Sequence, residues 1–346
     1  MKPKVLFIGG TGNVSAACSR LAIAQGFDLF LLNRGSRRNP QFPAGSSALS
    51  LDGAHFIAAD INDPGSVASA LAGQTFDVVV NFIAFELVEV QRDLNLWRGR
   101  CQQYIFISSA SCYTKPWLRP ITENVPLANP QWEYSRKKIA CEEWLATAAQ
   151  VPGFPHITVI RPSLTYDTVI PVPLGGWTEW TVAARMLAGK PAVVHGDGLS
   201  AWTVTHSEDF AQGLVGVLGK QKAYGEAFHI TGDEVQTWDE VYTKLADALG
   251  VQPRLVHVAS ETIAAVMPER AGSLLGDKSH ALVFDNAKIK ACVPSFAQKI
   301  PFAEGIKRTV GWFLADESRR TVSAAVDAQL DRLANQFATI PGAVKD

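Results

Sequence analysis

The sequence has few cysteines and few methionines. Of its 346 residues five are cysteine and three are methionine, and no two cysteines form a CxxC pair. Zinc clusters and disulfide frameworks need closely spaced or paired cysteines, so the sequence predicts neither disulfides nor a metal site. We expect small, buried thiols at Cys18, Cys101, Cys112, Cys141 and Cys292.

The sequence also lacks a surplus of charge and a long apolar run. Its 32 basic and 33 acidic residues give a formal net charge of −1. Nucleic acids and anionic membranes attract basic proteins, so we expect neither as a partner. The apolar run that follows Lys4 is too short for a signal peptide or a membrane span. We therefore expect a cytoplasmic protein.

What the first half does contain is an alternation of apolar runs and helical stretches. Candidate strands are Lys4–Ile8, Asp28–Leu32, Ala54–Ala58, Asp77–Phe82, Gln103–Ile107 and His156–Ile160, and candidate helices lie at 13–25, 64–73, 86–100 and 134–149. Strands that alternate with helices predict βαβ units, and continuous apolar strands predict a sheet covered on both faces. The fold class is therefore α/β, with a Rossmann-like, doubly wound parallel sheet.

The character of the chain changes after Pro162. Residues 166–201 are rich in Gly, Pro and Trp, whereas 202–232 again reads as strand, helix and strand. The last stretch, Ala315 to Ala338, has apolar residues at helical spacing and many charges, which predicts a surface or interface helix. We expect a dinucleotide-binding domain from 1–165 and 202–232, and a smaller, interleaved substrate-binding lobe from 166–201 and 233–346.

A glycine-rich turn, "GGTGNVS", joins the first strand to the first helix. A phosphate at a helix N-terminus needs free backbone N–H groups and no side chain in the way. The spacing is not the full dinucleotide fingerprint, and an ordinary strand–helix connection is the alternative interpretation. The predicted cofactor contacts here are Gly9, Gly10, Thr11, Gly12, Asn13 and Val14.

The second strand ends in "LLNRGSRR". NAD sites commonly place an acidic residue there to bind the ribose 2′-hydroxyl, but this chain has Asn33 followed by Arg34 and Arg38. A guanidinium matches the 2′-phosphate of NADP in charge and geometry. We expect NADP, led by Arg34, with NAD as the alternative cofactor. The competing interpretation is a solvated basic loop.

The next two strand ends supply further cofactor candidates. Asp60, with its neighbour Ile61, ends the third strand, where the carboxylate can accept from an adenine amino group. Asn81 and Ala84, in "NFIAF", end the fourth strand. The alternative interpretation for both pairs is that they merely end a strand and do not contact the cofactor.

Two later stretches contain residues suited to proton transfer. "YIFISSASCY" is a strand that ends in Ser108, Ser109 and Ser111, and "EYSRKKIACEEW" places Tyr134 and Lys138 on one helix face. A lysine beside a phenol favours phenolate and lowers its pKa. With a serine to hold the substrate oxygen, this is the relay that hydride transfer at a carbon–oxygen bond needs. The pattern Y-x-x-x-K alone is common by chance. The prediction therefore depends on the order of three features: a glycine-rich turn, then a strand that ends in serines, then this Tyr–Lys pair.

The chain resembles the NAD-dependent epimerase/dehydratase group of extended or atypical short-chain dehydrogenases/reductases. "GGTGNVS" is similar to the GGTGFIG loop, "FISSASCY" to SSxxVYG, "YSRKKIACE" to YxxSKxxxE, "IRPSLTYD" to RPxxVYGP, and "GDGLSAWTVTHSEDFA" to GDGxxxRDxxHVxDxA. These matches occur in order over residues 4 to 232.

The resemblance implies roles for particular residues. Tyr134 would be the catalytic acid/base, Lys138 would bind the nicotinamide ribose, and Ser109 would polarise the substrate oxygen. The remaining implied contacts are Ser108, Arg161 and Pro162 for the cofactor and Ser111 for the substrate. A homodimer through the helices at 86–100 and 134–149 is also implied.

The main departure from the family pattern affects the substrate. Where nucleotide-sugar enzymes carry an arginine for the diphosphate, Trp202 stands, which can stack on a ring but offers no fork to phosphate. Residues that could bind the phosphates in its place are Arg185, Lys190, Arg270, Lys278 and His280. For His206 and His280 a structural role is the alternative to a substrate contact. Trp177 and Trp180 stand near the expected cleft, and packing is the alternative interpretation for both.

Three functions follow from this reading. The first is an oxidoreductase or epimerase that exchanges hydride at a secondary alcohol or ketone of a sugar-like or natural-product substrate. The "NRG" sequence and the absence of glycine after Tyr113 also resemble the branch that includes plastid stem-loop RNA-binding proteins. RNA binding without catalysis, and NADP sensing without catalysis, are therefore the alternatives.

Overall fold

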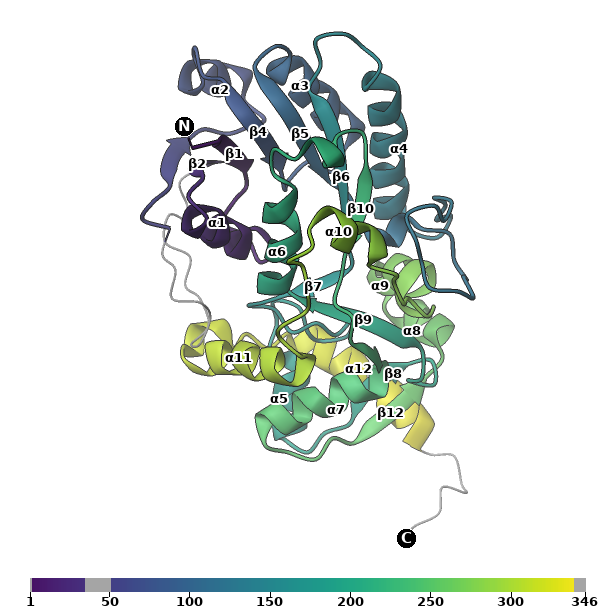
Figure 1. Ribbon diagram of the computed structural model, residues 1–346. Helices are drawn as coiled ribbons and strands as arrows, with labels where there is room; N and C mark the ends of the chain where they lie inside the picture. The colour runs from purple at the N-terminus through teal and green to yellow at the C-terminus, as the bar shows by residue number, and fades with distance from the viewer. Residues whose placement is uncertain (1, 35–50, 339–346) are drawn as a thin grey trace.

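Seven parallel strands form the central sheet in the order β10-β6-β5-β4-β1-β2-β3. The computed structural model describes residues 2–34 and 51–338 (Figure 1). The strands are β1 (Lys4–Ile8), β2 (Asp28–Asn33), β3 (His55–Ala58), β4 (Phe76–Asn81), β5 (Cys101–Ile107), β6 (His156–Pro162) and β10 (Ala227–Ile230). The order reverses between β1 and β4, and ligands of such sheets bind beside the strand ends at this reversal.

Helices cover both faces of this sheet, and alternate residues of β1 show why. Val5 and Phe7 pack with α1 (Ser15–Ala24) and α6 (Ser207–Val217). Leu6 and Ile8 pack on the opposite face with the other helices. Those helices are α2 (Pro64–Ala70), α3 (Leu87–Trp97) and α4 (Glu133–Ala148). The expected α/β, Rossmann-like fold class is confirmed.

The smaller lobe is built on two short sheets. One contains β7 (Leu164–Tyr166), β9 (Ala201–His206) and β11 (Val235–Thr237), and the other β8 (Ala192–His195) and β12 (Leu255–Val258). Its helices are α5 (Thr181–Leu187), α7 (Trp238–Leu249), α8 (Ser260–Val266), α9 (Pro268–Ser273), α11 (Phe302–Leu314) and α12 (Ala324–Ala338). In contrast, α10 (Ala287–Cys292) packs on β10 and joins the core of the central sheet. Short turns are η1 (Ala110–Cys112), η2 (Gln221–Ala223), the π-helical η3 (Leu274–Lys278) and η4 (Glu317–Arg319).

The chain passes repeatedly between the two lobes. β9 pairs with β7 and β11 in the smaller sheet, although we expected residues 202–206 with the dinucleotide-binding part. Twenty residues later β10 joins the central sheet beside β6. The lobes are therefore interleaved, with the smaller lobe below the sheet in Figure 1.

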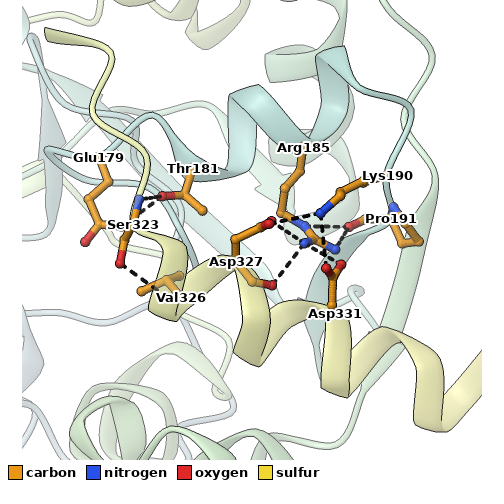
Figure 2. A network of polar contacts seen from close by, with 9 residues as sticks. All are labelled: Glu179, Thr181, Arg185, Lys190, Pro191, Ser323, Val326, Asp327 and Asp331. Carbon is orange, nitrogen blue, oxygen red and sulfur yellow. Dashed lines mark hydrogen bonds and ion pairs between the residues drawn. The ribbon is translucent and has the colours of Figure 1, made fainter. Parts of the chain in front are cut away.

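The last helix, α12, packs across the smaller lobe. Its Leu330 and Leu333 are buried with Leu174 and Leu274, which lie far apart in sequence. Figure 2 shows that Asp327 and Asp331 of this helix point toward Arg185 and Lys190. The helix begins at Ala324 rather than at 315, because η4 and an extended segment precede it.

Within residues 2–34 and 51–338, we find no helix that combines the length and the apolar character needed to cross a membrane.

Candidate active site

The glycine-rich turn forms a tight cradle between β1 and α1. Gly9 has φ +84°, and a Cβ atom there would lie 2.6 Å from Ile83 Cγ2. Ser15 occupies a place where many related loops have glycine, and it braces the turn. Its Oγ donates to the Gly9 carbonyl (2.7 Å) and accepts from the Gly12 N–H (2.9 Å). The serine therefore shapes the loop through two hydrogen bonds.

The N-terminus of α1 is suited to an anion. No acidic residue stands in its first turn, and Val14 at the N-cap position supplies no side-chain cap. The partial positive charge of the helix end is therefore left for a ligand. Asn13 fixes the loop from the other side, because its amide donates to Thr165 O (3.1 Å) and its Oδ1 accepts from Thr168 N (3.2 Å).

A cleft of about 480 Å³ runs from this turn along the ends of β2 and β3. The predicted cofactor residues that line it are Gly9, Thr11, Gly12, Asn33, Arg34, Asp60 and Ile61. Open glycines, a helix N-terminus and an exposed guanidinium fit the phosphates and ribose of a dinucleotide. Arg38 lies outside the described residues.

Several other predicted cofactor residues do not line this cleft. Gly10 is packed beneath the loop, where a Cβ would lie 2.5 Å from Leu31 Cδ2. Asn81 is fully buried: its Oδ1 accepts from Ile83 N (2.8 Å) and its amide donates to Asp93. The Asn81 side chain therefore shapes the loop after β4, and the expectation that it contacts the cofactor is corrected.

Ser108 and Arg161 belong to a buried polar network. Ser108 donates to Glu142, and Arg161 Nε donates to the same carboxylate (3.0 Å). Arg161 Nη1 also donates to the Tyr113 hydroxyl (3.1 Å). Ser108 is 1% exposed and Arg161 6%. These side chains join β5, β6 and α4, so the expected direct cofactor contacts are corrected to a structural role. Pro162 ends β6 next to them.

A second cavity, of about 350 Å³, lies at the ends of β5 and β6. Its lining residues are Ser109, Ser111, Trp132, Tyr134, Ser163, Leu164, Val172, Pro173, Trp177, Arg270, Ser273, Asp277 and Lys278. Three residues predicted for proton transfer or substrate contact, Ser109, Ser111 and Tyr134, thus meet at one cavity. They come from the turn after β5 and from the first turn of α4.

A chain of hydroxyls orients the serines. Ser109 Oγ lies 2.8 Å from Ser111 Oγ, which lies 2.7 Å from the buried Ser135 Oγ. Ser109 also hydrogen-bonds Tyr134, which acts to lower the phenol pKa, but burial dominates and raises that pKa to about 12. The Tyr134 phenol therefore keeps its proton at neutral pH. We expected the neighbouring Lys138 to lower the phenol pKa, and this expectation is corrected because burial raises it.

Lys138 is buried beneath the residues that line the cavity. Its Nζ donates to the carbonyls of Ala84 (2.6 Å) and Ile107 (2.8 Å) and lies 5.9 Å from the Tyr134 ring centroid. Burial lowers the pKa of this ammonium to about 8. Ala84 thus contributes its carbonyl as an anchor for Lys138.

Trp202 is not at the cavity surface. It is 1% exposed and packs against Trp238 with ring centroids 5.1 Å apart. The Lys278 ammonium stands 5.0 Å from the Trp202 ring centroid and lines the cavity. The expected substrate contact through Trp202 is therefore corrected: the indole supports a cation that η3 supplies.

The alternative clamp residues divide into two groups. Arg270 and Lys278 line the cavity. Arg185 and Lys190 instead form ion pairs with Asp327 of α12. The remaining candidates with structural roles are His206, which caps α6, His280, bonded to Leu275 O, and Trp180, which is 4% exposed.

The link between η3 and the serines of the cavity was not predicted from the sequence. Lys115 Nζ donates to Ser111 O (2.8 Å) and pairs with Asp277 (3.2 Å). Asn129 bridges Ser111 O (2.9 Å) and Gly276 O (2.7 Å). Trp132 and Ser163 were also missed as cavity residues. Trp132 directly precedes the quoted "EYSRKKIACEEW", and Ser163 lies inside the quoted "IRPSLTYD", so their positions in the sequence were the available signal.

Residues 5–231 match the NAD dependent epimerase/dehydratase family. The chain is 30% identical over 262 residues to the chloroplast stem-loop binding protein of 41 kDa b from Arabidopsis thaliana, covering 73% of this chain and 65% of that protein. It is 26% identical over 302 residues to 2'-dehydrokanamycin reductase from Streptomyces kanamyceticus, covering 86% and 80%.

The fold is shared with solved structures. The UDP-glucose 4-epimerase from Bifidobacterium longum, in complex with NAD+ and UDP, superposes with a TM-score of 0.71 at 17% identity, covering 91% of this chain and 99% of that one. Relatives of the chain are named as epimerases, dehydratases and reductases. The chain belongs to the NAD-dependent epimerase/dehydratase family and is an enzyme of that family.

Proposed function

We propose that this enzyme exchanges hydride between a nicotinamide cofactor and a secondary alcohol or ketone of a sugar-like or natural-product substrate. The observation that carries the proposal is the convergence of Ser109, Ser111 and Tyr134 at one cavity, with Lys138 buried below. Both this cavity and the glycine-loop cleft lie at the carboxyl ends of the parallel strands, where such sheets bind their ligands.

The chain's residues divide the chemical work. The bound cofactor supplies or accepts hydride. Ser109 holds the substrate oxygen by a hydrogen bond, and Tyr134 gives that oxygen a proton during reduction or takes one during oxidation. The Lys138 ammonium, fixed by two carbonyls, favours negative charge that develops on the phenol.

NADP is the proposed cofactor. Arg34 is exposed and lines the cleft beside Asn33, and no carboxylate follows β2 at the position typical of NAD sites. A guanidinium there favours a 2′-phosphate. We also propose a homodimer through α3 and α4.

The direct test is Tyr134→Phe, with Tyr224→Phe as a matched control because Tyr224 lines neither cavity. NADPH-dependent reduction of a panel of sugar ketones is expected to fall about a hundredfold or more in kcat for Tyr134→Phe, with cofactor affinity unchanged. Tyr224→Phe should match the wild type. Full activity in Tyr134→Phe would refute the proposal. Nicotinamide retained through purification would favour an epimerase or dehydratase, and an empty site a reductase.

Stem-loop binding is the second candidate, and the similarity to the chloroplast protein favours it. RNA affinity that falls steeply with salt, and that survives Tyr134→Phe, would support binding without catalysis. The formal charge of −1 argues against this outcome.

A further inference from the structure

Trp177 differs from the other large apolar side chains of its segment. It is 44% exposed. The buried ones around it are Val169, Ile170, Val172, Leu174, Trp180 and Val182, each at most 4% exposed. Single exposed apolar residues are ordinary on protein surfaces. This indole, however, forms part of the wall of the cavity that contains Ser109 and Tyr134.

The backbone holds Trp177 in an unfavourable conformation. Its φ is +65°, and it is the sole non-glycine residue with positive φ in the described part of the chain. For a bulky residue this is a genuine outlier, and such strain persists only where the surroundings enforce it. Here Trp177 N donates to Ile170 O (2.6 Å), and Ile170 N donates to Trp177 O (2.8 Å).

The turn that precedes Trp177 is packed so closely that the backbone of Trp177 has no room to relax. Gly175 has φ +66°, and a Cβ on Gly176 would lie 2.5 Å from Val172 Cγ2 and 2.9 Å from two carbonyl oxygens. The turn therefore fixes Trp177 at the cavity at a cost in backbone energy. A glycine at 177 would remove that cost, so the tryptophan is explained by its side chain rather than by the turn.

The other residues that line the cavity indicate which kind of ligand would contact the indole. Trp132 forms another part of the wall, and a Cβ on Gly272 would lie 2.6 Å from its Cδ1, so α9 packs directly on this ring. The other lining groups include four serines, Ser109, Ser111, Ser163 and Ser273. Aromatic faces bind C–H surfaces, and hydroxyls bind the polar edge of the same ligand.

We infer that Trp177 is a substrate-binding residue that selects ring-shaped polyols, with the C–H face of a pyranose ring stacked on its indole. This inference rests on the proposed function, because it assigns the substrate class of the same site. We expected Trp202 to stack on the substrate ring, but Trp202 is buried; the inference gives this role to Trp177.

The test compares a ring with an open chain of similar composition. Methyl β-D-glucopyranoside and sorbitol are titrated separately at millimolar concentrations, with and without NADP+, and binding is followed by saturation-transfer NMR. The wild type is expected to bind the ring about fivefold more tightly than the chain. Trp177→Phe should keep this preference. Trp177→Gly should lose it, yet unfold at the same or a higher temperature, because glycine adopts positive φ freely.

Trp117→Ala is the matched control, since Trp117 is 36% exposed but does not line the cavity; it should keep the ring preference. No preference in the wild type, or a preference that survives in Trp177→Gly, would overturn the inference. Failure of NADP+ to bind would count against the proposed function alone, because the sugar titration without NADP+ still decides the role of Trp177.

Discussion

Lys138 and Tyr134 show how burial sets proton chemistry at the scale of single residues. Burial lowers the pKa of Lys138 to about 8 and raises that of Tyr134 to about 12. At neutral pH the lysine is therefore charged and the tyrosine keeps its proton. Under the proposed function, Tyr134 would therefore begin ketone reduction with the proton that it gives to the substrate oxygen.

The first prediction concerns pH. As pH rises through about 8, Lys138 loses the charge that favours a developing phenolate, so kcat for reduction should fall. Lys138→Arg keeps its charge, because the guanidinium pKa lies far higher. We expect the fall to move to higher pH in this variant, as measured by kcat profiles of both proteins. An identical midpoint in the two profiles would contradict the assignment to Lys138.

The second prediction concerns Arg34, which is exposed in the cleft. Arg34→Ala should weaken NADPH binding about tenfold and leave NADH binding nearly unchanged, because only NADPH carries the 2′-phosphate. Fluorescence titration with both cofactors measures this. Arg254→Ala, an exposed arginine outside both cavities, is the control. Equal affinities for the two cofactors, unaltered by Arg34→Ala, would remove the proposed NADP preference.

Some residue assignments were within reach of the sequence and others were not. Ser109 and Tyr134 stand in ordered motifs, and both line the cavity. Trp202 lies on a strand, where the buried face depends on Trp238 from a distant helix. Arg161 looked available, but its partner Glu142 comes from α4. Local patterns cannot show such long-range partners.

At the scale of elements, α12 holds together parts of the cavity wall. Leu330 and Leu333 pack on Leu174, which follows Pro173, and on Leu274, which begins η3. Pro173 and η3 residues line the cavity. The ion pairs of Figure 2 attach this helix to α5 and the segment after it. The helix thus supports the wall of this cavity without lining it.

The third prediction is the stability of this attachment. Arg185 is 1% exposed and pairs with Asp327 (2.5 Å) and Asp331 (2.8 Å). Asp327→Asn with Asp331→Asn leaves a buried guanidinium without a counter-charge. The free energy of unfolding should fall by about 1 to 3 kcal/mol, the lower part of the range reflecting partial exposure of both aspartates. Chemical denaturation measures it.

The pH dependence of this loss has a definite sign. Hydrogen bonds from Lys190 and Arg185 lower the pKa of Asp327, and those from Arg185 and Lys190 lower the pKa of Asp331. Their contribution is therefore present above the ordinary value of 3.8 and is lost as pH falls through the lowered values. Glu317→Gln is the control and should have no measurable effect, because the Glu317 side chain is 93% exposed in its ion pair with Arg320. A double variant as stable as wild type at pH 7 would exclude the attachment.

Element boundaries show the limit of periodicity. The helix expected over 315–338 begins at Ala324, because Asp316 caps η4 and ends the preceding structure. The central strands were predicted closely, since continuous apolar runs between glycine turns are typical of a buried parallel sheet. The π-helical η3 has no comparable sequence signature, yet it supplies Asp277 and Lys278 to the cavity.

At the scale of the whole molecule, polar contacts tie the glycine loop to the smaller lobe. Asn13 bonds to Thr165 O and Thr168 N. Arg20 of α1 pairs with Asp167 (3.8 Å) and Glu208 (3.7 Å). The sequence order predicted interleaved lobes, but these contacts could not be foreseen, because Asn13 lies 152 and 155 residues from its two partners. They join the glycine-rich turn to the segment that directly follows Ser163 and Leu164 of the second cavity.

The most direct measurement is a crystal structure of the full chain with NADP+ bound. We predict that the phosphates bind at the turn that contains Gly9 and Gly12, the 2′-phosphate at Arg34, and the nicotinamide in contact with Tyr134. A dinucleotide bound elsewhere, or one whose nicotinamide lies away from the Tyr134 hydroxyl, would contradict it.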